Sequence, residues 1–136
     1  MEELSRAIRE AFPDGEPPKR PITDHRCPEC DVIDAIMGGR VWSDFADDFP
    51  WQCDAYSLLN EAARVYYLPA FLLAAIGPQC GTQNVSIESA LGDGRLDPKD
   101  FTAAQRFVIC QWAKSCWTST ANLPLETVLA TWTSER

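Results

Sequence analysis

Apolar residues recur along this chain at the three- and four-residue spacing of amphipathic helices, and no segment alternates convincingly as a surface strand does. This spacing predicts an opening helix over residues 2–12 and a second helix over Pro28–Met37, which Gly38 and Gly39 end. Between them, residues 16–23 hold three prolines, which remove backbone donors and keep the segment extended. The first third of the chain therefore reads as two helices joined by a proline-rich connector.

The middle of the chain carries the strongest helix signal. An aromatic segment at residues 42–51 predicts a helix of one to two turns, broken at Pro50. Asn60 is a good N-cap for a long helix that ends near Ile76 and is apolar on two faces, which places it centrally. Pro69 lies inside this helix, deletes one backbone hydrogen bond, and predicts a kink or a split there.

Three further helices are predicted in the C-terminal part. A short one covers residues 82–91. Thr102 and Gln105 form a capping box, in which each side chain satisfies a backbone donor of the other residue, ahead of a well-buried helix at 103–118. The last helix starts at Pro124.

Together these segments predict an all-α fold, a compact single-domain bundle of about five to six helices over residues 1–136 with the proline-rich connector near its N-terminus. The helices at 60–76 and 103–117 are expected to pack together at its centre. The hydrophobic fraction of 46% and the charged fraction of 24% are ordinary for a globular protein. The apolar run at Val65–Ile76 is shorter than the roughly twenty residues that a membrane span needs.

The net charge of −8 comes from 20 acidic and 12 basic side chains. It repels phosphate backbones and anionic lipid surfaces, so neither nucleic acid nor a membrane is an expected partner. Residues 41–62 contain no lysine or arginine. This stretch is either a solvated surface that keeps the protein soluble, or a negative patch for a basic partner protein. Its candidate contact residues are Asp44, Asp47, Asp48 and Asp54.

The candidate chemistry is concentrated at His25, Cys27 and Cys30, which are the only histidine and the only C-x-x-C pair of the chain. One imidazole nitrogen and two thiolates could hold zinc, with the sulfur atoms at roughly 2.3 Å from the metal. A structural zinc site needs a fourth ligand, for which Cys53 is the leading candidate and Cys80, Asp24 or a water are weaker ones. Three protein ligands and a water would instead be a catalytic geometry.

Two other interpretations of the same residues stay open. In a redox dithiol, Cys27 would sit at a helix N-terminus and Cys30 would resolve the mixed disulfide. The proline-rich connector before the motif and the acidic neighbours Asp24, Glu29 and Asp31 count against it. In a structural role, both cysteines are small, half-buried residues at a helix start. We expect the structural role, with zinc as the favoured functional alternative.

The first residues of the chain are polar and acidic, without the apolar stretch of a secretory signal, so a cytoplasmic location is expected. Thiols stay reduced in that compartment, and the six cysteines are therefore not interpreted as three disulfides.

Four pieces of the sequence together resemble a functionally uncharacterised family of small bacterial proteins. They are His25 to Asp31, Gly39 to Trp42, Tyr66 to Leu72, and Leu96 to Thr102, within residues 12–112. The resemblance implies a bacterial, cytoplasmic domain and carries over no catalytic residue.

Small size, acidity and the absence of a complete catalytic set favour a non-enzymatic interaction protein, of the immunity or antitoxin kind, that binds a basic protein. The alternative is a small zinc protein or metal-dependent hydrolase centred on His25, Cys27 and Cys30.

Overall fold

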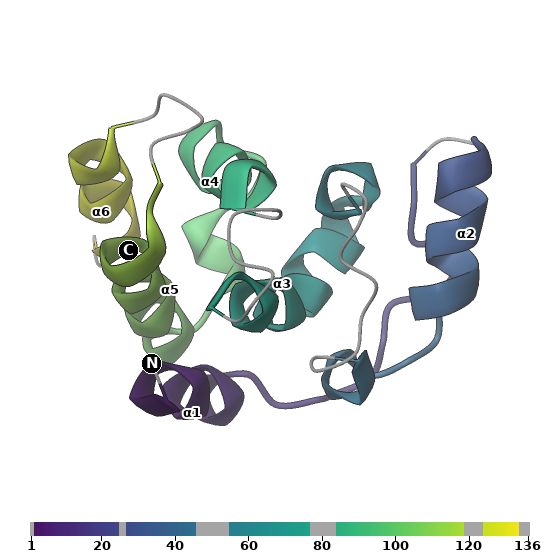
Figure 1. Cartoon of the computed structure of the whole chain (residues 1–136), viewed down its shortest axis with the longest axis horizontal. Helices are drawn as coiled ribbons and strands as arrows, with labels where there is room; N and C mark the ends of the chain where they lie inside the picture. Colours follow the sequence, from purple (N-terminus) through teal and green to yellow (C-terminus); the bar gives the residue numbers. More distant parts are fainter. Residues whose placement is uncertain (1, 25–26, 46–54, 77–83, 119–123, 134–136) are drawn as a thin grey trace.

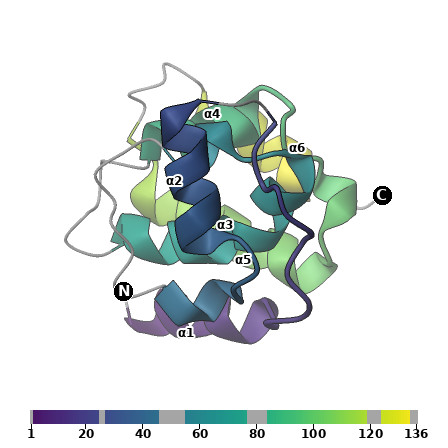
Figure 2. The same ribbon diagram turned by 90° about the vertical axis from the view of Figure 1, so that its right-hand side faces the viewer.

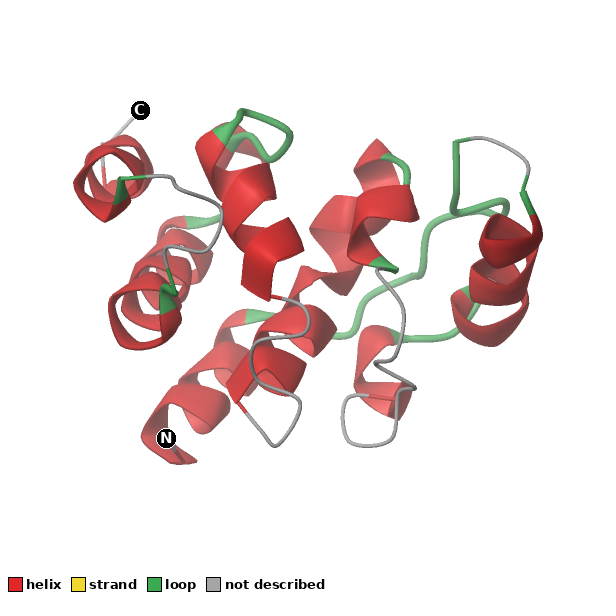
Figure 3. Ribbon diagram, turned by 45° about the horizontal axis from the view of Figure 1, so that its top comes forward, coloured by secondary structure: helices red, strands yellow, loops and turns green. Residues whose placement is uncertain are grey.

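The computed structural model describes residues 2–24, 27–45, 55–76, 84–118 and 124–133 (Figure 1). Within these ranges every regular element is helical, and the lone β-bridge pairs Thr23 with Leu59 (Figure 3). The α-helices are α1 (Glu2–Ala11), α2 (Pro28–Met37), α3 (Glu61–Ile76), α4 (Asn84–Gly92), α5 (Ala103–Cys116) and α6 (Leu125–Thr133). Single 3-10 turns are η1 (Trp42–Phe45), η2 (Tyr56–Leu58) and η3 (Pro98–Asp100). The predicted all-α single-domain fold is confirmed.

Helix α3 lies between α2, which forms one end of the molecule, and α5 with α6 at the other end (Figure 1). Figure 2 looks onto the α2 end, with α1 running along one side of the bundle. Helix α5 contacts α3, as predicted, but packs mainly against α1 and α6. One side of α5 faces solvent, because Phe107 is 55% exposed. The other side of the helix is well buried, as predicted, with Val108, Ile109 and Trp112 among its buried residues.

Helix α3 is the core of the fold, since every residue from Tyr67 to Ala75 is buried. Of the two predicted effects of Pro69, a kink or a split, the split does not occur, because Glu61–Ile76 is one helix with the proline inside it. A proline in a helix interior costs about 3 kcal/mol. Fully burying Leu68, Phe71 and Leu72 contributes roughly 1.5–3 kcal/mol each, which exceeds that cost. Tertiary packing therefore keeps the helix continuous.

Local capping begins the two longest helices as predicted. Asn60 Oδ1 accepts a hydrogen bond from the Ala63 N–H at 3.0 Å. Thr102 and Gln105 form the predicted capping box, with distances of 3.1 and 3.0 Å. The Gln105 amide also donates to the Ala11 carbonyl at 3.1 Å, which joins the start of α5 to the end of α1.

The aromatic segment is described only as far as Phe45. Its first residue, Trp42, is buried, and its indole N–H donates to the Pro13 carbonyl at 3.2 Å. The remainder of the predicted short helix lies outside the described residues. No helix that the structure describes is both long and apolar enough to cross a membrane.

Candidate functional site

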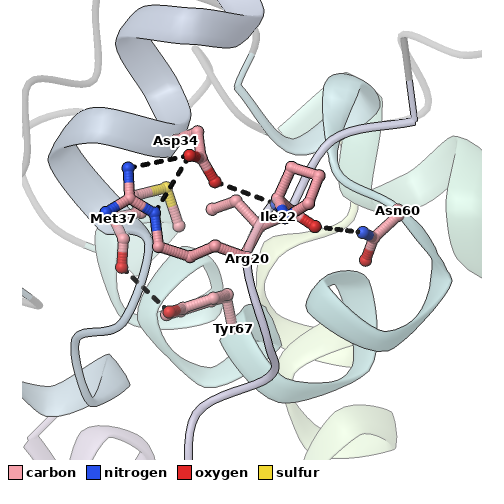
Figure 4. Close-up of polar contacts among 7 residues, drawn as sticks. Arg20, Ile22, Asp34, Met37, Asn60 and Tyr67 are labelled. Atoms are coloured by element: carbon pink, nitrogen blue, oxygen red, sulfur yellow. Dashed lines mark hydrogen bonds and ion pairs between the residues drawn. The ribbon is translucent and has the colours of Figure 1, made fainter.

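Helix α2 carries the candidate chemistry, and its middle is attached to the connector through Asp34 (Figure 4). The Asp34 carboxylate accepts hydrogen bonds from Arg20 Nε at 3.0 Å, Arg20 Nη2 at 2.8 Å and the Ile22 N–H at 2.9 Å. The Asn60 amide donates to the Pro21 carbonyl at 3.0 Å, so the connector is also tied to the start of α3. Burial raises the pKa of Asp34, but the bonds from Arg20 and Ile22 outweigh it and leave that pKa below its usual value of 3.8.

The C-terminal end of α2 is attached to the core by Tyr67. The phenol hydroxyl donates to the Met37 carbonyl oxygen at 2.9 Å (Figure 4). It also lies 2.8 Å from the Arg40 carbonyl oxygen, which is a second acceptor. The Tyr67 ring is completely buried. Burial, and then the neighbouring Tyr66, raise the pKa of Tyr67 to about 12, so the hydroxyl keeps its proton at neutral pH.

At the opposite end of α2, Cys27 and Cys30 lie side by side. Cys27 is the N-cap of the helix, ahead of Pro28, and its Sγ accepts a hydrogen bond from the Cys30 N–H at 3.1 Å. The two Sγ atoms are 2.6 Å apart. A disulfide bond measures about 2.05 Å, whereas two thiolates on one tetrahedral zinc ion are about 3.8 Å apart, from a zinc–sulfur distance near 2.3 Å. The observed spacing is closer to that of a sulfur–sulfur bond.

The two cysteines differ in exposure. Cys27 is partly exposed, whereas Cys30 is 1% exposed and packs on the core side of the helix with Ile33 and Met37. Burial, followed by the contact with Cys27, raises the pKa of Cys30 to about 11. Thr23 opposes this shift and Asp31 adds to it. Cys30 is therefore a protonated thiol at neutral pH.

The predicted metal site is only partly covered by the structure. His25 and Cys53 lie outside the described residues, and Asp24 is exposed. Among the residues that are described, no group of three histidine, cysteine, aspartate or glutamate side chains is arranged to hold a metal ion. A zinc site at His25, Cys27, Cys30 and Cys53 therefore stays a prediction.

The predicted acidic patch is also described in part, because Asp47, Asp48 and Asp54 fall outside the described ranges. Asp44 belongs to η1, and its side chain is 53% exposed. Its carboxylate lies 4.0 Å from Nε of Arg40, four residues earlier, and such an exposed pair adds little to stability. Asp44 is therefore accessible to solvent, and its role in binding a partner stays a prediction.

A second acidic feature was not predicted. Asp24, Glu61 and Asp100 line an open groove of about 700 Å³ together with Asn60, Ala62 and Val65. All three carboxylates are exposed, and the lining residues that the structure describes include no lysine or arginine. Local patterns could not reveal this groove, because Asp24 comes from the connector, Glu61 from the first turn of α3, and Asp100 from η3.

A buried polar cluster between α4 and the end of α5 was likewise missed. Glu88 is fully buried, and its Oε2 accepts hydrogen bonds from the Thr118 N–H at 2.8 Å and the Thr118 hydroxyl at 2.7 Å. The Asn84 amide donates to the Cys116 carbonyl at 2.9 Å. These contacts supply hydrogen-bond partners to the Cys116 carbonyl and the Thr118 N–H, where α5 ends. We therefore assign the cluster a structural role.

Comparisons of this chain with family models, curated proteins and solved structures found no match. The resemblance to a family of small bacterial proteins therefore stays a prediction.

Proposed function

We propose that this protein is a non-enzymatic interaction protein, of the immunity or antitoxin kind, that binds a basic segment of a partner protein. The supporting observation is the acidic groove, where Asp24, Glu61 and Asp100 line an open space and the described lining residues include no basic side chain. Exposed Asp44 adds a further negative charge outside the groove, and the net charge of the whole chain is also negative, at −8. A partner surface rich in lysine and arginine is complementary to this arrangement.

The magnitude of the electrostatic attraction determines how much the groove contributes to the affinity and to the association rate. An ammonium group about 4 Å from one carboxylate gains about 1 kcal/mol in bulk water and about 4 kcal/mol at an effective dielectric constant near 20. The three carboxylates are exposed before binding, so desolvation offsets part of this gain. The groove therefore raises the association rate and selects for positive charge, while apolar contacts elsewhere must provide most of a tight affinity.

The proposal includes a bacterial source, which the family resemblance suggests, and a cytoplasmic location. The cysteines on the described residues are free thiols, which suits a compartment in which glutathione and thioredoxin keep thiols reduced.

The test is titration with a lysine- and arginine-rich peptide at two salt concentrations. The double variant Glu61→Gln/Asp100→Asn removes two groove carboxylates while leaving their shapes nearly unchanged. Two exposed ion pairs at roughly 0.2–1 kcal/mol each predict an affinity loss of about two- to thirtyfold. The loss should shrink at high salt, because the attraction is screened.

The matched control is Glu10→Gln/Glu126→Gln, which removes the same number of charges from exposed positions on α1 and α6, outside the groove. It should bind the peptide almost as the parent protein does. An equal loss in both double variants would show that net charge alone attracts the peptide, and the groove proposal would be rejected. Any natural partner recovered from a bacterial lysate must show the same difference between the two variants.

A further inference from the structure

The contact between Cys27 and Cys30 supports a chemical activity that is independent of the acidic groove. The two sulfur atoms of these free cysteines are 2.6 Å apart, so forming a bond between them requires a shift of roughly half an ångström. The spacing of two residues between the cysteines at the first turn of a helix produces this closeness. A dithiol held in this way is prepared to close into an intramolecular disulfide.

The unequal exposure of the two sulfurs assigns them different roles. Cys27 is partly exposed at the helix N-cap, where a disulfide in solution can reach it. Cys30 is 1% exposed, so its accessible reaction partner is the neighbouring Cys27 sulfur. One exposed attacking thiol beside one buried resolving thiol is the arrangement that thiol–disulfide exchange requires.

The helix supplies a hydrogen-bond donor at the attacking sulfur. The Cys30 N–H donates to Cys27 Sγ at 3.1 Å, at the positive end of the α2 dipole. Glu29 and Asp31 oppose negative charge at this place, but both are exposed and therefore screened by solvent and salt. The hydrogen bond from the N–H group fixes the position of Cys27 Sγ at the first turn of the helix.

The rest of α2 is held independently of the dithiol. Asp34 binds Arg20 and the Ile22 N–H, and the Met37 carbonyl accepts a hydrogen bond from Tyr67. All of these contacts lie between one and two turns beyond Cys30. Closing and opening the sulfur–sulfur bond therefore changes the first turn of the helix and leaves its attachment to the core in place.

We propose that Cys27 and Cys30 are a redox-active dithiol that reduces an accessible disulfide by exchange. The Cys27 thiolate attacks one sulfur of the substrate, the substrate S–S bond breaks, and the departing sulfur leaves as a thiolate that takes up a proton. Cys30 then loses its proton and attacks Cys27 Sγ, which breaks the mixed disulfide and releases the second substrate thiol. In total two electrons pass from the dithiol to the substrate, which gains two protons, and Cys27 and Cys30 end as a disulfide.

The experiment begins with chelator-treated, fully reduced wild-type protein, to which oxidised glutathione is added. Intact mass should fall by two hydrogens, and peptide mapping should find a bond between Cys27 and Cys30. A parallel reaction with a disulfide-bonded peptide distinguishes a small-molecule substrate from a protein one, because the preferred class reacts faster. Brief alkylation of the reduced wild-type protein should label Cys27 before Cys30. This measurement does not depend on whether any variant folds.

Three variants test the separate roles. Cys27→Ser should abolish the reaction at this pair. Cys30→Ser should stop at the mixed disulfide, with one glutathione bound to Cys27. Cys110→Ser removes another buried thiol, on α5, and should react as the wild-type protein does. Circular dichroism of each variant shows whether it is folded.

Three results would overturn the proposal. The first is wild-type protein that forms no Cys27–Cys30 bond in oxidised glutathione or with the peptide. The second is a Cys30→Ser variant that folds and yet forms no adduct at Cys27. The third is a stoichiometric metal that both thiols hold before chelation and that must be present for α2 to fold. If the lysine- and arginine-rich peptide fails to bind the acidic groove, the proposed function is rejected, but these tests of the dithiol are unaffected.

Discussion

Replacing Tyr67 by phenylalanine measures how firmly α2 is attached to the core. The hydroxyl of Tyr67 lies within 2.9 Å of the Met37 and Arg40 carbonyl oxygens, and the ring is completely buried. The substitution therefore keeps the packing of the ring and removes a single oxygen atom. Because one hydroxyl hydrogen is shared between two carbonyls, the loss amounts to about one net hydrogen bond rather than two.

The expected loss follows from this geometry. A net hydrogen bond contributes about 0.5–1.5 kcal/mol, and a buried acceptor left without its donor costs about 1–3 kcal/mol. Arg40 is only partly buried, so water can replace part of what its carbonyl loses. We expect the free energy of unfolding to fall by about 1–2 kcal/mol. With an unfolding entropy of about 2.1 cal/mol/K per residue, this lowers the Tm of the 136-residue chain by about 3–7 °C.

Urea unfolding followed by circular dichroism measures this difference, and an unchanged m-value would show that the unfolded state is the same. Tyr66→Phe is the matched control. The Tyr66 hydroxyl accepts the Trp42 N–H at 3.3 Å and lies 3.5 Å from the Gly15 carbonyl, both longer contacts on a half-buried side chain. Its removal should cost about 0.5 kcal/mol or less. Equal losses for the two variants, or no loss for Tyr67→Phe, would refute the assignment of Tyr67 as the anchor.

Two further substitutions test the core and the connector. Leu73→Asp should unfold the protein, because burying an unpaired carboxylate in α3 costs several kcal/mol against a total stability of roughly 5–15 kcal/mol; a variant with the parent's Tm would show that this face of α3 is not core. Asp34→Asn should lower the free energy of unfolding at neutral pH by about 1–3 kcal/mol, since it weakens the bonds from Arg20 and Ile22. The folded-state pKa of Asp34 is below its usual 3.8, so the stability that its charge contributes is present above pH 3.8 and is lost as the pH falls through the lower, folded-state value. Acid titration of the wild-type protein and of Asp34→Asn by circular dichroism should show their stabilities converging below pH 3.8. A difference that persists at lower pH would show that the charge of Asp34 is not the cause.

Local sequence determined which segments are helical and where most of them begin. Pro28–Met37 has the predicted bounds, because its signals are an early proline and a terminal glycine pair within the same few residues. The capping box at Thr102 depends on residues three positions apart, and it was predictable for the same reason. The side-by-side placement of Cys27 and Cys30 follows from their spacing at a helix start. Each of these features depends on interactions within about one helical turn.

Only the tertiary structure decided which helices are neighbours and which charges gather. The continuity of α3 through Pro69 required the burial of the residues around it, which a local rule for proline cannot include. The outward side of α5 at Phe107 depends on which faces α1 and α6 cover.

The same is true of the contacts that shape the candidate sites. Asp34 meets Arg20 across 14 positions of the chain, and the groove joins Asp24 to Asp100. Glu88 reaches Thr118, which is 30 positions away. Sequence spacing gives no signal for such pairs, because the chain folding back on itself determines their separation in space. The sequence therefore located the dithiol, and the fold determined the groove beside α3 and the anchor that holds α2.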